Sequence, residues 1–429
     1  MMKKRFFLFV ALVVLFCNSY AAFGQAAGRE TVIRLLVSAG GSGRAFQGGV
    51  NQFNEQFKGR YRVEVDTIAF ESLLDKAMTQ FIARNASYDV IGINSSWQNR
   101  VARFLEPLDS YIRQGNVDVN TLYGSALMES FKYESKVIGL PIRIGTDVLF
   151  YRKDLLQEAG LEVPQTLDQL RDAARKLTIG PERNRERYGL SFTAQSPYWT
   201  TTNLADFLFM FGVYFLDENG TQANPALRGP VTVKILNFIK SLHDERLIPN
   251  PLEWTYDDNI VALQQGKLAM AYDDYMRGPL LENPDVSTVA GRMAYSMMPN
   301  AKEGPNEPRA RGGWWILGVD KNSRNKQAAF ELVKFLTSYE TQRYMAVNWA
   351  NGPTVLSMLT LPEFVKANPA AGAAHQNLST LGLRDPIPVA QRPNIEKVVH
   401  DEFHLFILGR KSAQDAANAM YNGINQLLR

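Results

Sequence analysis

Hydrophobic and polar positions follow a regular order from residue 31 onward. Segments 31–39, 61–69 and 88–96 are mostly apolar or alternate between apolar and polar residues, as β-strands do. Helical patterns at 45–57 and 71–85 separate these segments. This β-α-β-α-β order predicts a parallel sheet covered by helices. We expect ligand contacts in the loops that follow the carboxyl ends of the strands.

The segment 133–170 predicts a connection between two lobes. Apolar strand patterns at 137–140 and 146–151 are interrupted by Pro141 and Gly145. Proline cannot donate a backbone hydrogen bond to a sheet, and glycine weakens a strand interior. Such a segment can cross from one lobe to another and bend between them, and a cleft between lobes is a common ligand site.

Beyond this connection the pattern is mainly helical to about residue 290. The clearest helical segments are 167–177, 202–211, 230–245 and 257–265. A second extended segment, 311–320, begins with glycines and continues with apolar residues, so we expect it to cross between the lobes as well. An amphipathic helix pair at 325–348 and two helices at 394–408 and 412–428 complete the chain.

The order of elements predicts two lobes, each assembled from separate parts of the chain. We expect an α/β fold in which each lobe is a mostly parallel sheet flanked by helices, joined by a multi-strand hinge. The predicted boundaries are 29–141 plus 317–372 for the first lobe, 146–312 plus 375–429 for the second lobe, and 141–146, 312–317 and 372–375 for the hinge.

The N-terminus has the layout of a secretory signal peptide. Three basic residues precede an apolar run at 6–16, and small residues follow it. We expect a signal peptide at 1–24 and a periplasmic protein, because the run is too short to span a bilayer comfortably. Phe16 precedes Cys17, the only cysteine, where a lipoprotein signal needs a small residue, so lipid anchoring is not expected.

Charge argues against a nucleic-acid partner. The chain carries 47 basic and 43 acidic residues, and loss of the signal peptide removes three of the basic ones, so the mature chain is nearly neutral. The densest basic segment, 181–187, also contains two glutamates and favours a solvated loop.

Seven groups of segments occur in a recognisable order. They are YDVIGINSSW, RFLEPLDSYI, VIGLPIRIGTDVLFYRKDLLQEAG with PQTLDQLRDAARKL, YGLSF, GKLAMAYDDY, GGWWILGVDKNSRNKQAAFELVKFLTS and GRKSAQDAANAM. With them the chain resembles the extracellular solute-binding proteins of bacterial ABC importers, in the group related to maltose-binding protein. One departure is Arg152 before Lys153, where relatives usually carry Asn. It lies on a turn and does not affect the ligand inference.

The resemblance implies a function as well as a fold. It implies a two-lobed protein that closes on a solute by a hinge motion and is then recognised by a membrane permease. It also implies a protein without catalytic activity and without a cofactor. We expect a monomer that binds a small molecule, most often a sugar in this group.

A sugar site combines aromatic rings with polar groups, because sugars present flat C–H faces edged by hydroxyls. The aromatic candidates are Phe70, Trp97, Trp199, Trp254, Tyr275 and Trp314. Each tryptophan taken alone is equally consistent with core packing. Consecutive residues of a strand point to opposite faces, so one of Trp314 and Trp315 should face the ligand, and we favour Trp314.

Polar candidates come from the turns and the hinge. They are Ser42, Arg143, Asp147, Asp274, Arg311 and Arg392. Ser42 lies in GGSG, which is either a hydroxyl-binding or anion-binding helix start or a plain tight turn. Arg143 and Asp147 flank the hinge glycine. The resemblance implies that the residue at Arg392, after a Pro-rich linker, is often directed at the ligand.

Two patterns suggest other chemistry. His400 and His404 are one helical turn apart, but a zinc-protease helix needs Glu where this chain has Asp401, so a surface helix is favoured and no metal is expected. The doublets 257–258 and 273–274 hold adjacent acids, which point apart rather than facing each other.

The leading hypothesis is therefore that the protein captures a carbohydrate, with an oligosaccharide as the preferred class. A secreted carbohydrate-active enzyme is the alternative from another class. A third hypothesis keeps the binding fold but changes the ligand to a polyamine, a phosphorylated polyol or a peptide. Many tryptophans argue against a highly charged ligand, whereas Arg143, Arg311 and Arg392 leave an anionic one open.

Overall fold

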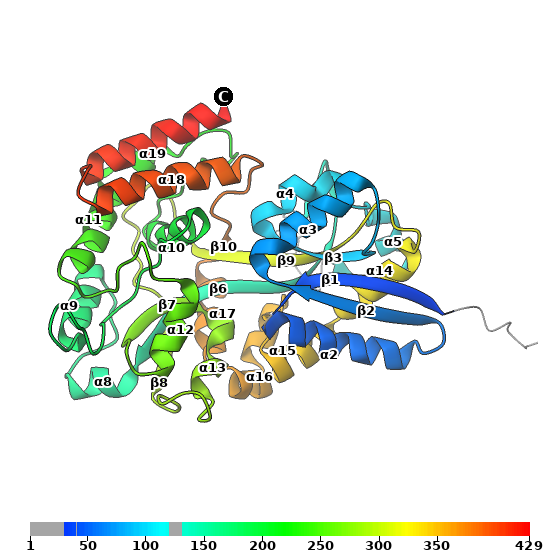
Figure 1. The fold of residues 1–429 in the computed structure, drawn as a ribbon, viewed down its shortest axis with the longest axis horizontal. Coiled ribbons are helices and arrows are strands. Elements are labelled where there is room, and N and C mark those ends of the chain that lie inside the picture. Colours follow the sequence, from blue (N-terminus) through cyan, green and yellow to red (C-terminus); the bar gives the residue numbers. More distant parts are fainter. Residues whose placement is uncertain (1–29, 40, 120–130) are drawn as a thin grey trace, which may run out of the picture.

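The computed structural model describes residues 30–39, 41–119 and 131–429, which form two lobes lying side by side (Figure 1). The predicted signal peptide at 1–24 and Cys17 lie outside the described residues. Within the described ranges, the helices are all too short or too polar to cross a membrane.

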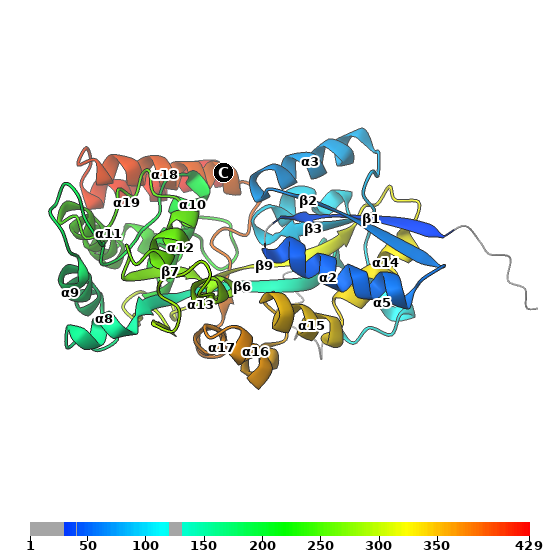
Figure 2. The ribbon, with the colours of Figure 1, turned by 60° about the horizontal axis from the view of Figure 1, so that its bottom comes forward.

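The first lobe has the predicted β-α-β-α-β order. Its elements are β1 (Thr31–Ser38), α2 (Gly41–Gln56), β2 (Tyr61–Ile68), α3 (Phe70–Ala83) and β3 (Val90–Asn94). β1 pairs in parallel with both β2 and β3. α2 and α3 cover opposite faces of these strands (Figure 2). The alternation and the helical periodicity therefore identified this part of the fold correctly.

Two long strands cross from one lobe to the other. β6 (Leu140–Arg152) and β9 (Ala310–Val319) pair antiparallel, and the sheet order β2-β1-β3-β9-β6-β7 makes one continuous sheet through both lobes (Figure 1). The sequence predicted two strands broken at Pro141 and Gly145, and this break is wrong. The proline lies at a register shift between Pro141 and Arg143, where its missing N–H is tolerated, so the strand continues.

The two-lobed α/β architecture is confirmed, and its strand pairing is mixed. β9 is antiparallel to β3 and β6. β7 (Met270–Asp274) and β8 (Met293–Ser296) are antiparallel to β6. The crossing strands thus bring antiparallel pairing into a sheet that was expected to be mostly parallel. The predicted lobe boundaries stay a prediction.

Helices surround the sheet in both lobes. Those before β9 are η1 (Ser95–Trp97), α4 (Gln98–Val101), η2 (Ala102–Phe104), α5 (Asp109–Gln114), α8 (Lys153–Glu158), α9 (Leu167–Leu177), α10 (Pro197–Met210), η3 (Pro225–Arg228), α11 (Pro230–Asp244), α12 (Tyr256–Gln264), η4 (Tyr275–Arg277) and α13 (Pro279–Glu282). Those after β9 are α14 (Lys326–Leu336), α15 (Tyr339–Trp349), η5 (Leu356–Thr360), α16 (Pro362–Ala367), α17 (Ala371–Thr380), α18 (Arg392–Ile407) and α19 (Ala413–Leu428). The short strands are β4 (Lys132–Tyr133), β5 (Lys136–Val137) and β10 (Leu383–Arg384). α10 begins at Pro197 rather than at residue 202, because Ser196 caps it and proline suits a first helical position.

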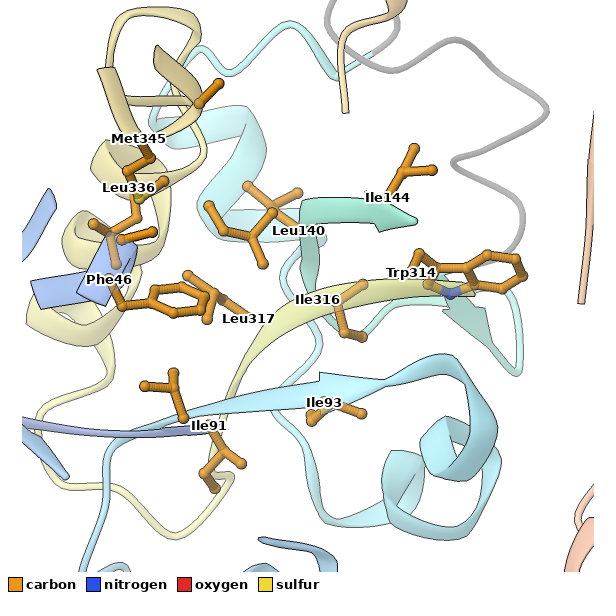
Figure 3. Close-up of a cluster of buried hydrophobic side chains, with 14 of the residues drawn as sticks. Phe46, Ile91, Ile93, Leu140, Ile144, Trp314, Ile316, Leu317, Leu336 and Met345 are labelled. Atoms are coloured by element: carbon orange, nitrogen blue, oxygen red, sulfur yellow. The ribbon is translucent and has the colours of Figure 1, made fainter. Parts of the chain in front are cut away.

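The buried apolar side chains form two clusters. The first extends from the sheet of the first lobe along β6 and β9 as far as Tyr275 and Leu281. Figure 3 shows part of it, including Ile93, Leu140 and Ile316. The second cluster lies within the second lobe. Since burial of one such side chain contributes about 1.5–3 kcal/mol, the crossing strands are held in a core rather than running as free linkers.

His400 and His404 form a close pair on α18, with ring centroids 3.8 Å apart and ring planes tilted by 48°. The hydroxyl of Thr200 donates to the carbonyl oxygen of Ala194, so His400 Nδ1, 2.8 Å from that hydroxyl, must be its donor. His404 Nε2 is 2.7 Å from the same carbonyl and must also donate. Both rings therefore fasten α18 to α10 and the segment before it. Among the described residues no cluster of three or more potential metal ligands occurs.

This pair predicts a loss of stability in acid. Burial, and then the neighbouring His404, lower the pKa of His400 to about 4. Because that value lies below the ordinary pKa of histidine, about 6.5, the stabilisation is complete above pH 6.5 and is lost as the pH falls towards 4. The ring is partly exposed, so we expect a loss of about 1–2 kcal/mol. Denaturant unfolding at several pH values should show a flatter profile for His400→Gln. The control His375→Gln, on α17, should keep the parent profile, and an unchanged His400→Gln profile would contradict this origin.

Candidate functional site

The crossing strands present a half-exposed face that carries two paired glycines. Gly145 of β6 is opposite Gly313 of β9, and Arg143 is opposite Trp315. These four residues are all partly exposed, as the alternation of a strand requires. A Cβ atom at Gly313 would meet only Ser95 Oγ, at 3.5 Å. The two glycines, called here the glycine floor, lie two residues along the strands from the Arg143–Trp315 pair, and at Gly313 the backbone is left uncovered.

Asp274 borders the glycine floor on its other side. It ends β7, opposite Asp147 of β6. A Cβ atom at Gly145 would lie 2.6 Å from Asp274 Oδ2, so the carboxylate occupies the space that a side chain at Gly145 would fill. Arg143 is 3.8 Å from the same oxygen, and its Nε donates to the sulfur of Met276 at 3.1 Å. An acid and a base thus lie together at one edge of the floor.

Burial raises the pKa of Asp274 to about 6. The charge of Arg143 opposes this rise, and the negative charge of Asp147 adds to it. The carboxylate therefore changes its charge near neutral pH, unlike an ordinary exposed aspartate.

A buried ion triad lies next to this edge. Arg311 of β9 pairs with Asp147 of β6, and its Nε donates to Asp206 of α10 at 2.8 Å. The two carboxylates are almost completely buried. Burial raises the pKa of Asp206 well above its ordinary value, against the opposing charge of Arg311. Arg311 and Asp147 therefore satisfy one another, and they tie the two crossing strands to α10.

A series of aromatic rings runs from the floor into the second lobe. In order they are Trp97, Trp315, Phe70, Tyr198, Trp199 and Tyr256, and this set is called here the aromatic chain. Trp315 is 6.3 Å from Trp97 and 5.9 Å from Phe70, between ring centroids. Phe70, at the start of α3, is 5.7 Å from Tyr198 on α10, so the chain passes from the first lobe to the second. Trp199 is stacked on Tyr256 at 4.1 Å with an interplanar angle of 11°.

The structure brings some of the predicted site residues together. Those at the floor, the ion triad or the aromatic chain are Phe70, Trp97, Arg143, Asp147, Trp199, Asp274 and Arg311. Of these, Trp97 is only 5% exposed and packs behind Trp315. Ser42 lies in the first turn of α2, and its side chain is outside the described part of the chain.

Three predicted aromatic residues lie elsewhere. Trp314 belongs to the buried cluster of Figure 3 and is only 8% exposed. Its indole N–H donates to Gln98 at 3.1 Å. Tyr275 is completely buried beneath β6. Trp254 donates to Asn259 at 2.8 Å. The structure thus reverses our preference between the paired tryptophans, since strand alternation turns Trp314 into the core and Trp315 towards the floor.

Arg392 does not line the glycine floor but supports a residue of the aromatic chain. It is buried at the start of α18 and pairs with Asp385 at 2.7 Å and Glu396 at 2.6 Å. Its guanidinium lies 5.9 Å from the ring of Tyr198. Its position was expected to contact a ligand directly, but its contacts support Tyr198 instead.

Sequence reasoning missed several residues of this site. They are Ser95, Tyr198, Tyr256 and Gly313, whereas Trp315 was considered but ranked below Trp314. For Gly313 and Trp315 a signal was present, because they alternate with Arg311 along one strand face. Choosing that face requires the register of β9 against β3 and β6, which the sequence alone does not supply.

A family model described as bacterial extracellular solute-binding protein matches residues 39–343, more than half of the chain. Among individual proteins, a probable amino-acid ABC transporter periplasmic-binding protein of Sinorhizobium fredii is 25% identical over 407 residues, covering 92% of this chain and 89% of that protein. The mannitol-binding protein of Pseudomonas aeruginosa is 25% identical over 270 residues, covering 61% of this chain and 59% of that protein.

Solved structures share the fold. Maltose-bound MalE3 of T. maritima has a TM-score of 0.80 and 22% identity, covering 92% of this chain and all of that one. A ribitol complex of an ABC transporter solute-binding protein from Agrobacterium radiobacter has a TM-score of 0.78 and 22% identity, covering 92% of this chain and 98% of that one.

Proposed function

Because the chain belongs to the bacterial extracellular solute-binding protein family, we propose that it captures a carbohydrate between its lobes and delivers it to an ABC-importer permease. The preferred class of carbohydrate is an oligosaccharide. The protein acts as a monomer in the periplasm, without a cofactor and without catalysis. Relatives named for mannitol and maltotriose binding support a polyhydroxylated solute.

The glycine floor carries the proposal. A side chain at Gly313 would stand in open space above the strands, so its absence leaves room for a flat solute, and the Asp274 carboxylate borders that room at Gly145. Trp315 offers an apolar ring on the β9 side of the floor, and Arg143 and Asp274 offer a donor and an acceptor on the β6 side. A sugar ring matches this set because it combines C–H faces with hydroxyl groups.

Charge at the floor favours a neutral solute. Arg143 and Asp274 carry opposite charges and lie 3.8 Å apart, and Arg311 is balanced by two carboxylates. A polyamine would need an excess of carboxylates, and a phosphorylated polyol an excess of bases. The balanced pairs therefore support a neutral carbohydrate over both.

A secreted carbohydrate-active enzyme is supported less well. Glycoside hydrolysis uses two carboxyl groups that flank the scissile bond. Asp147 and Asp274 are register partners on adjacent strands, and Asp147 is engaged by Arg311. Both therefore belong to one side of the floor rather than to opposite sides of a bound sugar.

Titration calorimetry and tryptophan fluorescence against a panel test the proposal. The panel holds maltose, maltotriose, mannitol, ribitol, spermidine and the common amino acids. We expect saturable binding of at least one carbohydrate or polyol, weakened by Trp315→Ala and retained by the control Trp254→Phe. Saturable binding of amino acids or spermidine alone, or a flat response to the whole panel, would overturn the assignment.

Asp274 should make this binding depend on pH. Its pKa of about 6 lies above the ordinary aspartate value, so the carboxylate is ionised above pH 6 and protonated below it. Hydroxyl donors bind an ionised acceptor more strongly, so affinity should fall between pH 7.5 and 5. Asp274→Asn should lower affinity at pH 7.5 by about 10–100-fold, matching about 1.5–3 kcal/mol for a charged hydrogen bond. It should also flatten the profile, and a slope that persists in Asp274→Asn would assign the titration to another group.

A further inference from the structure

Tyr256 touches both kinds of group that a sugar needs. It is the first residue of α12, directly after Thr255, which forms a reciprocal capping box with Asp258. Its ring is stacked on Trp199, with centroids 4.1 Å apart. Its hydroxyl oxygen accepts the backbone N–H of Asp274 at 3.0 Å. One side chain thus connects an aromatic ring of the second lobe with the strand end that carries the floor's carboxylate.

Arg277 holds Tyr256 from the other face. The guanidinium carbon lies 4.2 Å from the Tyr256 ring centroid, so it and Trp199 must occupy opposite faces of that ring. Arg277 also donates to the Tyr256 carbonyl at 3.2 Å and to Asp257 at 3.1 Å. It lies 3.4 Å from Asp273, whose side chain is completely buried. The guanidinium is therefore fixed at several points, and a cation over a ring is itself attractive.

We propose that Tyr256 is a positioning residue that fixes the Trp199 ring relative to Asp274, and that Arg277 locks it in place. This inference rests on the proposed function, and it identifies the residues that hold the groups of the proposed binding site in place. A sugar must contact a ring with its C–H face and a carboxylate with its hydroxyls at the same time. Fixing the two groups before binding lowers the ordering cost of the complex.

The hydroxyl of Tyr256 is suited to a permanent support. Burial raises the pKa of Tyr256 well above its ordinary value, and the nearby Asp273 raises it further. The hydroxyl therefore stays neutral throughout the range in which Asp274 titrates. The contact with the Asp274 backbone should then persist at every pH where binding is measured.

Two substitutions separate the two contacts. Tyr256→Phe keeps the stacked ring but removes the hydroxyl acceptor. Tyr256→Leu removes the ring as well. In ligand-free protein, Tyr256→Phe should keep the near-ultraviolet circular dichroism that arises from the Trp199 stack, and Tyr256→Leu should lose it. The loss should vanish in a Trp199→Phe background, which assigns the signal to this pair.

Binding gives the second readout, with maltose, maltotriose and mannitol as probes. Tyr256→Phe should weaken affinity about 5-fold, as expected for one hydrogen bond, and shift the midpoint of the pH profile. Tyr256→Leu should weaken it further at unchanged far-ultraviolet circular dichroism. The matched control is Tyr188→Leu, which removes a ring 6.5 Å from Trp254 and should leave affinity unchanged.

The outcomes decide between positioning and general packing. An equal loss of affinity in Tyr188→Leu and Tyr256→Leu, or an unchanged pH midpoint in Tyr256→Phe, would overturn the positioning role. If the near-ultraviolet signal of Trp199 survives in ligand-free Tyr256→Leu, the positioning role is also overturned, independently of any binding measurement. If none of the probes binds, the proposed function fails, whereas the spectroscopic result still decides whether Tyr256 fixes Trp199.

Discussion

Replacing Gly313 with valine should abolish solute binding while the protein stays folded. Gly313 has ordinary strand geometry, and a Cβ atom there would meet only Ser95 Oγ at a normal contact distance of 3.5 Å. Valine also favours extended backbone. Its methyl groups would stand above the glycine floor, where the solute is proposed to lie. We expect affinity to fall at least about 100-fold, or about 2.8 kcal/mol, with the melting temperature unchanged or higher.

The neighbouring glycine provides the matched control. A Cβ atom at Gly312 would lie 1.9 Å from a methyl carbon of Leu383 and 2.6 Å from the Gly145 carbonyl oxygen. Gly312→Ala should therefore destabilise the fold by about 1–3 kcal/mol through overpacking. Calorimetry and thermal unfolding of both variants should give opposite outcomes. Full binding by Gly313→Val would show that the solute does not rest on the floor.

Replacing Arg311 with methionine should give the largest loss of stability. It would leave Asp147 and Asp206 buried side by side without their cation. Removing one member of a buried ion cluster typically costs about 3–5 kcal/mol, because the remaining charge is uncompensated. Burial already raises the pKa of Asp206, so one proton should be taken up in the variant. Denaturant unfolding at pH 7.5 measures the loss.

Arg343 offers a comparison at the surface. It pairs with Glu363 at 2.6 Å, but about half of its side chain is exposed. Arg343→Gln should cost less than about 1 kcal/mol, since exposed pairs contribute little. Combining Arg311→Met with Asp147→Leu and Asp206→Leu should restore most of the stability, because no buried charge remains. An Arg311→Met loss no larger than that of Arg343→Gln would contradict the triad as a stabilising element.

The sequence predicted local elements better than it predicted contacts. Alternation and helical spacing identified the β-α-β-α-β start of the chain, because burial on one face sets those periods. They failed at Pro141, where a register shift lets the strand continue. They also could not choose between Trp314 and Trp315. Alternation separates the two residues, but only pairing with β3 and β6 decides which one turns into the core.

The stacking of Trp199 on Tyr256 had no local signal in the sequence. Trp199 and Tyr256 belong to different helices, and their stacking depends on how α10 and α12 are placed. Arg392 was recognised as a significant position, and Glu396 follows it by one turn of α18, but the pairing with Asp385 became visible only in three dimensions. Resemblance indicated where a solute should bind, whereas the packing behind the binding groups follows from side-chain detail in this chain.

The central place of β9 sets the order in which the chain can fold. β9 spans 310–319, yet it lies between β3 and β6, strands that are made far earlier. Neither lobe can complete its sheet before roughly three quarters of the chain has emerged, so contacts distant in sequence must form late and together. A newly made chain therefore lacks the central strand of its sheet until about three quarters of its synthesis is complete. That delay suits a member of a bacterial extracellular family, whose chain must cross a membrane before its fold is complete.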